Sequence, residues 1–125
     1  MQTRVAENYL RTIYEIIENQ GYVRTKDVAN SMGVKASSAS EMLNKLDQAG
    51  LVIYKKYSGI SLTSEGKKLA NIVNQKYKVF MELFEIAGVD SKVAYKDACI
   101  LEHYISNETN LKIQNLVEKL KNDKQ

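Results

Sequence analysis

The sequence predicts a mainly α-helical protein in which a winged helix-turn-helix precedes a helical domain. The 125 residues contain no proline and only six glycines, so long helices with few breaks are expected. Apolar residues recur at three- and four-residue steps over most of the chain, as they do on one face of a helix. Residues 51–62 are instead rich in β-branched and aromatic residues around a short polar connection, which predicts two strands joined as a hairpin.

The first half of the chain predicts three helices before this hairpin. Gly21, Gly33 and Gly50 follow the three apolar patterns and are suited to end the helices. Thr25 is expected to cap the second helix. Two helices separated by a tight glycine turn are the arrangement of a helix-turn-helix, and the hairpin is its wing. The expected helices cover residues 6–18, 26–32 and 36–49.

The second half predicts three more helices. A long helix is expected to open at Thr63 with a capping hydroxyl and to stop at Gly88. Asp90 is expected to cap a fifth helix that reaches about Tyr104. A sixth helix should follow, capped by Ser106 or Asn107, with a frayed polar tail over residues 121–125. The predicted domains are therefore a winged helix-turn-helix, residues 1–71, and a helical domain, residues 72–125.

Composition excludes several classes of protein. No apolar run approaches the roughly 18 residues that a membrane span needs, and the first residues lack the apolar stretch of a secretory signal. The single cysteine, Cys99, excludes an internal disulfide framework and fits a reducing cytoplasm. One cysteine and one histidine on the same helix, without a glycine-rich phosphate loop, argue against an enzyme. A cytoplasmic protein that is not an enzyme is expected.

The charge is concentrated in the middle of the chain. Residues 24–69 carry eight basic and four acidic side chains, whereas the flanking segments are nearly balanced. A basic segment of this kind indicates a polyanionic partner, most simply double-stranded DNA. The alternative is a solvated lysine-rich surface.

The helix-turn-helix indicates which residues would contact DNA. The third helix of such a motif enters the major groove, with its N-terminal residues nearest the base edges. Basic and hydroxyl side chains around it are suited to phosphate contacts, which set affinity rather than sequence preference. The residues expected nearest the bases are Lys35, Ala36, Ser37, Ser38, Ser40 and Glu41. The expected phosphate contacts are Thr25, Lys26, Lys45, Lys55, Lys56 and Tyr57.

The second half has more apolar positions than its short helices can bury alone. A second copy of the chain is therefore expected to cover part of them, and a symmetric dimer also matches paired DNA half-sites. The residues expected to meet the second copy are Phe80, Phe84, Leu101, Tyr104 and Ile105.

Four segments carry a family likeness. They are residues 7–15 (ENYLRTIYE), the helix-turn-helix residues 27–34 (DVANSMGV) and 37–40 (SSAS), the wing exit 62–70 (LTSEGKKLA) and residues 97–103 (DACILEH). With these segments the chain resembles the metal-dependent repressors of the diphtheria-toxin-repressor type, which have iron- and manganese-sensing branches. The resemblance implies a homodimeric repressor that binds a palindromic operator with a divalent metal as co-repressor.

The last segment predicts a metal site. Cys99, Glu102 and His103 are spaced i, i+3 and i+4, which places them on one face of a helix. A thiolate, a carboxylate and an imidazole together favour a divalent transition metal over magnesium or calcium. This segment is similar to the Cys-x-x-Glu-His helix of the iron branch, and the resemblance implies Fe2+ rather than Mn2+, with Asn8 as a further ligand.

The sequence also departs from the family pattern. The iron branch has a methionine where Asn8 stands, and a manganese-type member would carry carboxylates at the positions of Asn8 and Arg11. Tyr77, Met81 and Tyr95 replace the residues of an ancillary metal site, so one metal per protomer is expected. The SH3-like domain of larger members is expected to be absent.

Two other functions remain open from the sequence. A regulator of the same fold with a degenerate metal site would leave Cys99 as a core residue or a thiol sensor. A winged helix can also serve as a protein-interaction module without binding DNA.

Overall fold

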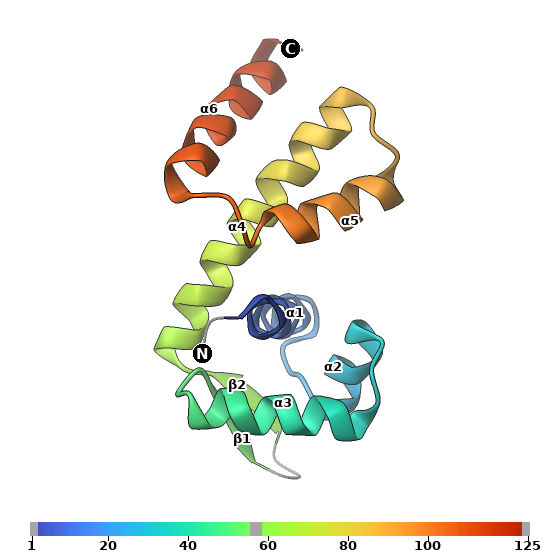
Figure 1. Ribbon diagram of the computed structural model, residues 1–125, viewed down its shortest axis with the longest axis vertical. Helices are drawn as coiled ribbons and strands as arrows, with labels where there is room; N and C mark the ends of the chain where they lie inside the picture. The colour runs from blue at the N-terminus through green and yellow to red at the C-terminus, as the bar shows by residue number, and fades with distance from the viewer. Residues whose placement is uncertain (1–2, 56–58, 124–125) are drawn as a thin grey trace. The chain divides into compact units, whose positions relative to one another are not determined.

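The computed structural model describes residues 3–55 and 59–123, which form six helices and one two-stranded sheet. The helices are α1 (Arg4–Gln20), α2 (Thr25–Met32), α3 (Ala36–Gln48), α4 (Ser64–Ala87), α5 (Ser91–Leu101) and α6 (Asn107–Asp123), and the strands are β1 (Val52–Lys55) and β2 (Gly59–Leu62). Figure 1 shows this order of elements along the chain. The predicted mainly α fold, a winged helix-turn-helix followed by a helical domain, is confirmed.

The chain divides into two compact units, Met1–Asn71 and Ile72–Gln125. The first unit contains α1, α2, α3, the sheet and the first eight residues of α4. The second contains the rest of α4 with α5 and α6. No helix formed by residues 3–55 and 59–123 is both long enough and apolar enough to cross a membrane.

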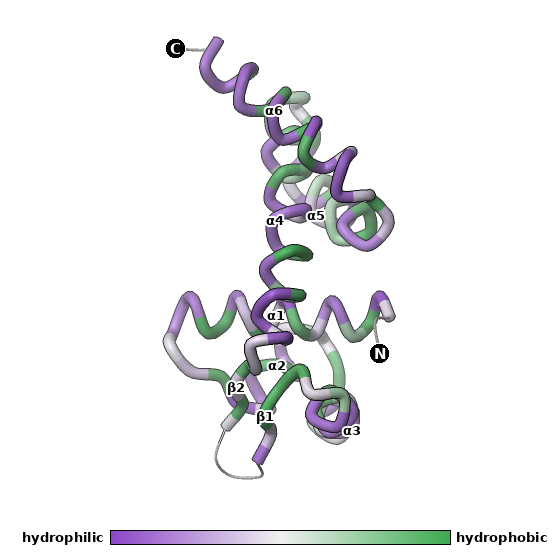
Figure 2. Tube along the Cα trace, turned by 90° about the vertical axis from the view of Figure 1, so that its left-hand side faces the viewer, coloured by the Kyte–Doolittle hydropathy of each residue, from purple (hydrophilic) through white to green (hydrophobic). Residues whose placement is uncertain are grey.

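The core of the first unit is built from one face of each helix. Hydrophobic and hydrophilic residues alternate along α1 in Figure 2, and its apolar face buries Leu10 and Ile13. The interior also takes Val28 from α2, Leu43 from α3 and Val52 from β1. Val5, near the start of α1, is an apolar residue that stays 51% exposed.

The sheet is the wing of the helix-turn-helix. Its strands are antiparallel, with Val52 opposite Leu62 and Lys55 opposite Gly59. The backbone N–H of Ile60 donates to the carbonyl of Val23 at 3.2 Å, which ties β2 to the segment before α2. The backbone N–H of Tyr54 in β1 also donates to the Asp47 carboxylate of α3 at 2.8 Å, so the hairpin has a defined position beside α2 and α3.

Hydrogen bonds from side chains to backbone N–H groups mark the starts of α1, α2, α5 and α6, and some of these starts differ from the predicted boundaries. Thr3 accepts from the N–H of Ala6 at 3.1 Å, so α1 begins two residues earlier than predicted. Thr25 is the first residue of α2 and not its cap; Asp27 instead accepts from the backbone N–H of Arg24 at 3.0 Å. The predicted caps Asp90 and Ser106 are confirmed by their hydrogen bonds to the N–H groups of Lys92 and Thr109.

The ends of α5 and α6 differ from the prediction. The fifth helix ends at Leu101 rather than about Tyr104, and residues 102–104 form a turn. The sixth helix continues to Asp123, although a frayed tail was expected from Lys121. Lys121 donates to Glu82 of α4 at 2.8 Å, and this contact raises the pKa of Lys121. The last turn of α6 is thus joined to α4 by an ion pair.

Candidate DNA-binding surface and candidate metal ligands

The third helix has a buried face and an exposed polar face. Ala39, Leu43 and Leu46 are fully buried at steps of four and three residues, so the opposite side of the helix faces away from the core. Of the residues expected nearest the bases, five are exposed: Lys35, Ala36, Ser37, Ser38 and Glu41. Asn44, which the sequence reasoning missed, is exposed in the same stripe as Ser37 and Glu41.

The lysines expected at phosphates lie in several elements of the first unit. Lys26 is exposed in α2, Lys45 in the last turn of α3 and Lys55 at the end of β1. Lys35 precedes α3 with an extended backbone. Lys56 and Tyr57, which were also expected to contact DNA, lie outside the described residues.

Two expected DNA contacts point toward Tyr54. Thr25 and Ser40 are half-buried. The Thr25 hydroxyl donates to the Tyr54 hydroxyl at 3.3 Å, and the hydroxyls of Ser40 and Tyr54 are 3.1 Å apart. The sequence reasoning missed Tyr54, although strand alternation puts it on the same side of β1 as the buried Val52.

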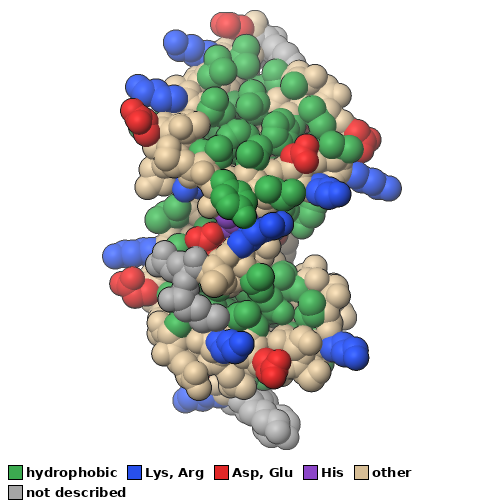
Figure 3. Space-filling view, viewed as in Figure 1, with side chains coloured by type: hydrophobic (Ala, Val, Ile, Leu, Met, Phe, Trp, Pro, Cys, Tyr) green, Lys and Arg blue, Asp and Glu red, His purple; other side chains and the backbone are tan. Residues whose placement is uncertain are grey.

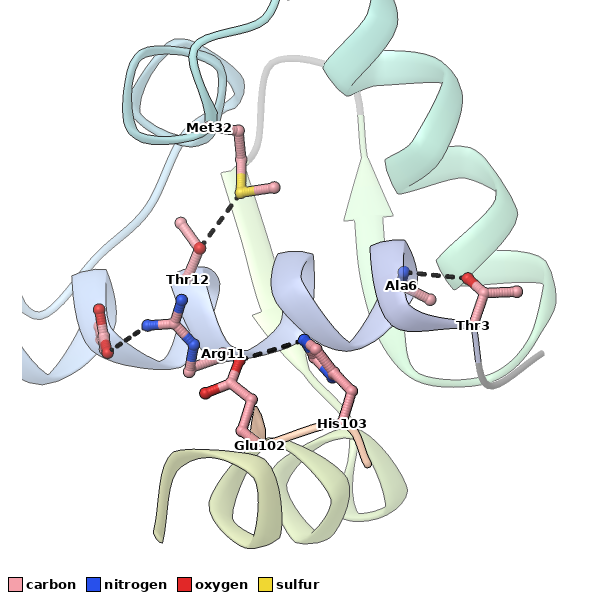
Figure 4. Close-up of polar contacts among 8 residues, drawn as sticks. Thr3, Ala6, Arg11, Thr12, Met32, Glu102 and His103 are labelled. Carbon is pink, nitrogen blue, oxygen red and sulfur yellow. Dashed lines mark hydrogen bonds and ion pairs between the residues drawn. The ribbon is translucent and has the colours of Figure 1, made fainter. Parts of the chain in front are cut away.

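The expected metal ligands of the second unit lie at the end of α5. Cys99 is half-buried in the last turn, Glu102 follows the helix as its C-cap, and His103 lies in the turn. The side chains of Glu102 and His103 are 0% and 2% exposed, and their Oε1 and Nε2 atoms are 3.2 Å apart (Figure 4). Asn8, the fourth expected ligand, is half-buried in α1 of the first unit.

The predicted three-donor face is formed only in part. The helix α5 ends at Leu101, so Glu102 and His103 lie in the turn that follows it. Within residues 3–55 and 59–123, no three Asp, Glu, His or Cys side chains come together in a group that could hold a metal ion. The adjacent carboxylate and imidazole are of the types that bind divalent transition metals, so the structure provides two suitable donors side by side.

The surroundings of this segment are fixed by α4. Lys76 donates to the backbone carbonyl of Ile105 at 2.8 Å, which holds the connection between α5 and α6. The rings of Tyr77 and Tyr95, two of the positions where the sequence departs from the family's ancillary site, pack edge to face with centroids 5.8 Å apart. The side chains of Tyr77 in α4 and Tyr95 in α5 therefore contribute to packing between these two helices.

Two family models together match nearly the whole chain. The N-terminal DNA-binding domain of the iron dependent repressors matches residues 1–60, and their metal-binding and dimerisation domain matches residues 63–125.

Curated relatives are similar over almost their full length. The HTH-type transcriptional regulators MntR of Bacillus velezensis and Bacillus subtilis are each 36% identical to the chain over 123 residues, which cover 98% of this chain and 87% of each relative. The name MntR does not assign these relatives to the iron branch of the family, which residues 97–103 of this chain resemble.

Solved structures share the fold. A manganese-dependent transcriptional repressor in complex with manganese has a TM-score of 0.80 at 29% identity over 90% of this chain and 52% of that chain. The manganese regulator SloR has a TM-score of 0.77 at 29% identity over 90% of this chain and 53% of that chain. The chain therefore spans about half the length of these structures. With a DNA-binding module and a metal-binding module matched along its length, the chain belongs to the iron dependent repressor family and is a metal-dependent transcriptional repressor.

Proposed function

We propose that the protein represses transcription as a homodimer on a palindromic operator, with one divalent transition metal per protomer as co-repressor. The observation that carries this proposal is the division of the chain between the two family models, one for DNA binding and one for metal binding and dimerisation. Exposed Ser37, Ser38 and Glu41 in α3 would read the bases, and exposed Lys26, Lys45 and Lys55 would contact phosphates.

The metal would be held by Cys99, Glu102 and His103. The proximity of Glu102 and His103 supports two of these ligands, and Cys99 lies one helical turn before them. A bound cation would supply the positive charge that holds a thiolate, a carboxylate and an imidazole together. The Tyr77–Tyr95 contact supports a single site, since two positions of an ancillary site carry packed rings.

We expect Fe2+ to bind more tightly than Mn2+. Affinity for nitrogen, oxygen and sulfur ligands rises from Mn2+ to Fe2+, and a thiolate ligand strengthens the preference for the softer metal. Manganese is the competing candidate, because the similar repressors are named for manganese.

Anaerobic titration with Co2+ tests the ligand set directly. A thiolate ligand gives an intense near-ultraviolet charge-transfer band, which should saturate at one metal per protomer and disappear in Cys99→Ser, a variant of similar size. Competition by Fe2+ and Mn2+ against bound Co2+ then ranks the two metals. Binding should weaken as the pH falls, because the thiol must lose its proton to coordinate.

DNA binding must respond to the same metal. Metal and operator affinities are coupled reciprocally, so a duplex selected from a random library should bind more tightly with metal than with chelator. A wild-type chain that shows no thiolate band and binds the selected duplex equally well with chelator would contradict the proposal. The absence of a three-donor group among the described residues would then be explained by a degenerate site and a different controlling signal.

A further inference from the structure

Tyr54 lies where three elements of the first unit meet. From β1 its hydroxyl contacts Thr25, the first residue of α2, and Ser40, in the second turn of α3. The two distances, 3.3 Å to the Thr25 oxygen and 3.1 Å to the Ser40 oxygen, are within hydrogen-bonding range. One phenol therefore connects the hairpin with both helices of the helix-turn-helix.

A second contact ties the same strand to α3. The backbone N–H of Tyr54 donates to the Asp47 carboxylate at 2.8 Å. Ser40 and Asp47 are seven residues apart, which places them on the same side of α3, two turns from one another. Two attachments on one side of a helix restrict its rotation about its own axis.

These attachments lie beside the exposed stripe of Ser37, Glu41 and Asn44. Hydrogen bonds to base edges weaken steeply when distances or angles depart from their preferred ranges. A small rotation of α3 would therefore weaken several base contacts together. The backbone bond to Asp47 does not involve the phenol, so loss of the hydroxyl would leave β1 attached to α3 at one point.

We propose that the Tyr54 hydroxyl is a positioning group for DNA reading: it fixes the orientation of α3 through Ser40, and Ser40 itself does not read a base. This inference rests on the proposed function, in which α3 enters the major groove. It assigns sequence discrimination to the exposed side chains of Ser37, Glu41 and Asn44, so it adds Asn44 to the base-reading residues named above and does not require Ser38. An asparagine is suited to adenine and a glutamate to cytosine.

The test compares Tyr54→Phe with wild type on two DNA probes. One probe is the duplex that wild type enriches from a randomised library, and the other is an unselected duplex of the same length. Tyr54→Phe keeps the ring and removes only the hydroxyl, and Tyr22→Phe, at an exposed tyrosine of the same unit, is the matched control. Thermal unfolding of each variant shows whether the protein is folded at the assay temperature.

The expected result is a loss of discrimination. In Tyr54→Phe the ratio of the two dissociation constants should fall by about tenfold, as for the loss of one base contact, while Tyr22→Phe keeps the wild-type ratio. A purely structural defect would lower the active fraction for both probes and leave the ratio unchanged. The dependence on salt should also stay as in wild type, because no phosphate contact is lost.

A double-mutant cycle with Ser40→Ala separates positioning from direct contact. If Tyr54 acts through Ser40, the double variant should discriminate no worse than either single variant, because both remove the same interaction. Additive losses would mean that one of the hydroxyls contacts DNA by itself, and would overturn the inference. An unchanged ratio in Tyr54→Phe would also overturn it, whereas a wild-type chain that enriches no sequence would overturn the proposed function along with it.

Discussion

Gly66 is the position at which a single methyl group would disturb the first unit most. It lies buried in the first turn of α4, where the helix passes against the backbone of Leu51. Thr63 holds this turn in place, since its hydroxyl accepts from the Gly66 N–H at 3.0 Å and donates to the Gly50 carbonyl at 2.7 Å. The glycine is required here by a close approach of two backbones.

Gly66→Ala should lower the free energy of unfolding by about 3 kcal/mol, because the new Cβ would overlap the Leu51 carbonyl and the backbone must shift. Chemical denaturation measures the change, and Lys67→Ala at the exposed neighbouring position should stay within about 0.5 kcal/mol of wild type. The sign of the change distinguishes backbone overlap from helix propensity, since propensity alone predicts that Gly66→Ala would stabilise the protein by about 1 kcal/mol.

Tyr9 provides a prediction for alkaline pH. Its side chain is 4% exposed in α1, and burial raises the pKa of its phenol above the ordinary value of about 10. The folded state therefore holds this proton more tightly than the unfolded state. The resulting stability is fully present below the unfolded pKa and is lost as the pH rises through the folded pKa.

Urea unfolding at a series of pH values from neutral upward should show this loss. In Tyr9→Phe the decline above the ordinary tyrosine pKa should be smaller than in wild type, because the buried phenol has been removed. Tyr22→Phe, at an exposed tyrosine, should decline as wild type does. Equal slopes in wild type and Tyr9→Phe would show that the buried phenol does not control alkaline stability.

At the scale of elements, the wing hairpin is expected to contribute affinity rather than sequence preference. Lys55, at the end of β1, is exposed and carries its charge beyond the packed part of the sheet. A lysine that neutralises a phosphate releases counterions, so its loss changes how binding depends on salt.

Lys55→Ala should therefore reduce the slope of log K against log salt by about 0.9 and weaken binding similarly on selected and unselected duplexes. Lys119→Ala removes the same charge from the exposed side of α6 and should leave the slope unchanged. Fluorescence anisotropy across a range of salt concentrations measures both. Identical slopes for Lys55→Ala and wild type would remove this lysine from the DNA backbone.

At the scale of the whole molecule, the second unit exposes apolar side chains that a second copy could cover. Figure 3 shows hydrophobic side chains gathered over the helices of this unit. Tyr104 is 69% exposed, Leu111 55% and Val93 50%. Phe80 was expected at the contact with a second copy, but it is only 6% exposed and packs against Phe84 within the chain. Phe84, Leu101 and Ile105 are half-buried.

Sedimentation at micromolar concentration should give about twice the 14.2 kDa mass of the monomer, because covering this surface removes apolar area from water. Tyr104→Asp should shift the equilibrium toward monomer. Tyr22→Asp, at a comparably exposed tyrosine of the first unit, should not. A monomeric wild-type chain would contradict both the dimer and the paired half-sites of a palindromic operator.

The sequence determined the number, order and type of the elements, because these depend on local periodicity and on capping groups. The apolar steps of α1, the glycine turn before α3 and the β-branched residues of the hairpin each predict their element. The caps Asp90 and Ser106 were also predictable, since a capping side chain bonds a backbone N–H only two or three residues further on.

The tertiary structure decided what depends on distant partners. The fifth helix ends at Leu101 without a glycine or proline to stop it, and Lys76, from another helix, holds the carbonyl of Ile105 beyond it. Glu102 and His103 therefore lie in the turn beyond the helix on which the predicted metal face depended. The sequence predicts that Thr25 and Ser40 contact DNA. In the structure their hydroxyls contact the Tyr54 hydroxyl, because the hairpin packs against both α2 and α3. Local sequence patterns determine which side chains lie on each face of a helix, whereas only the packing of segments distant in the sequence determines which residues each side chain contacts.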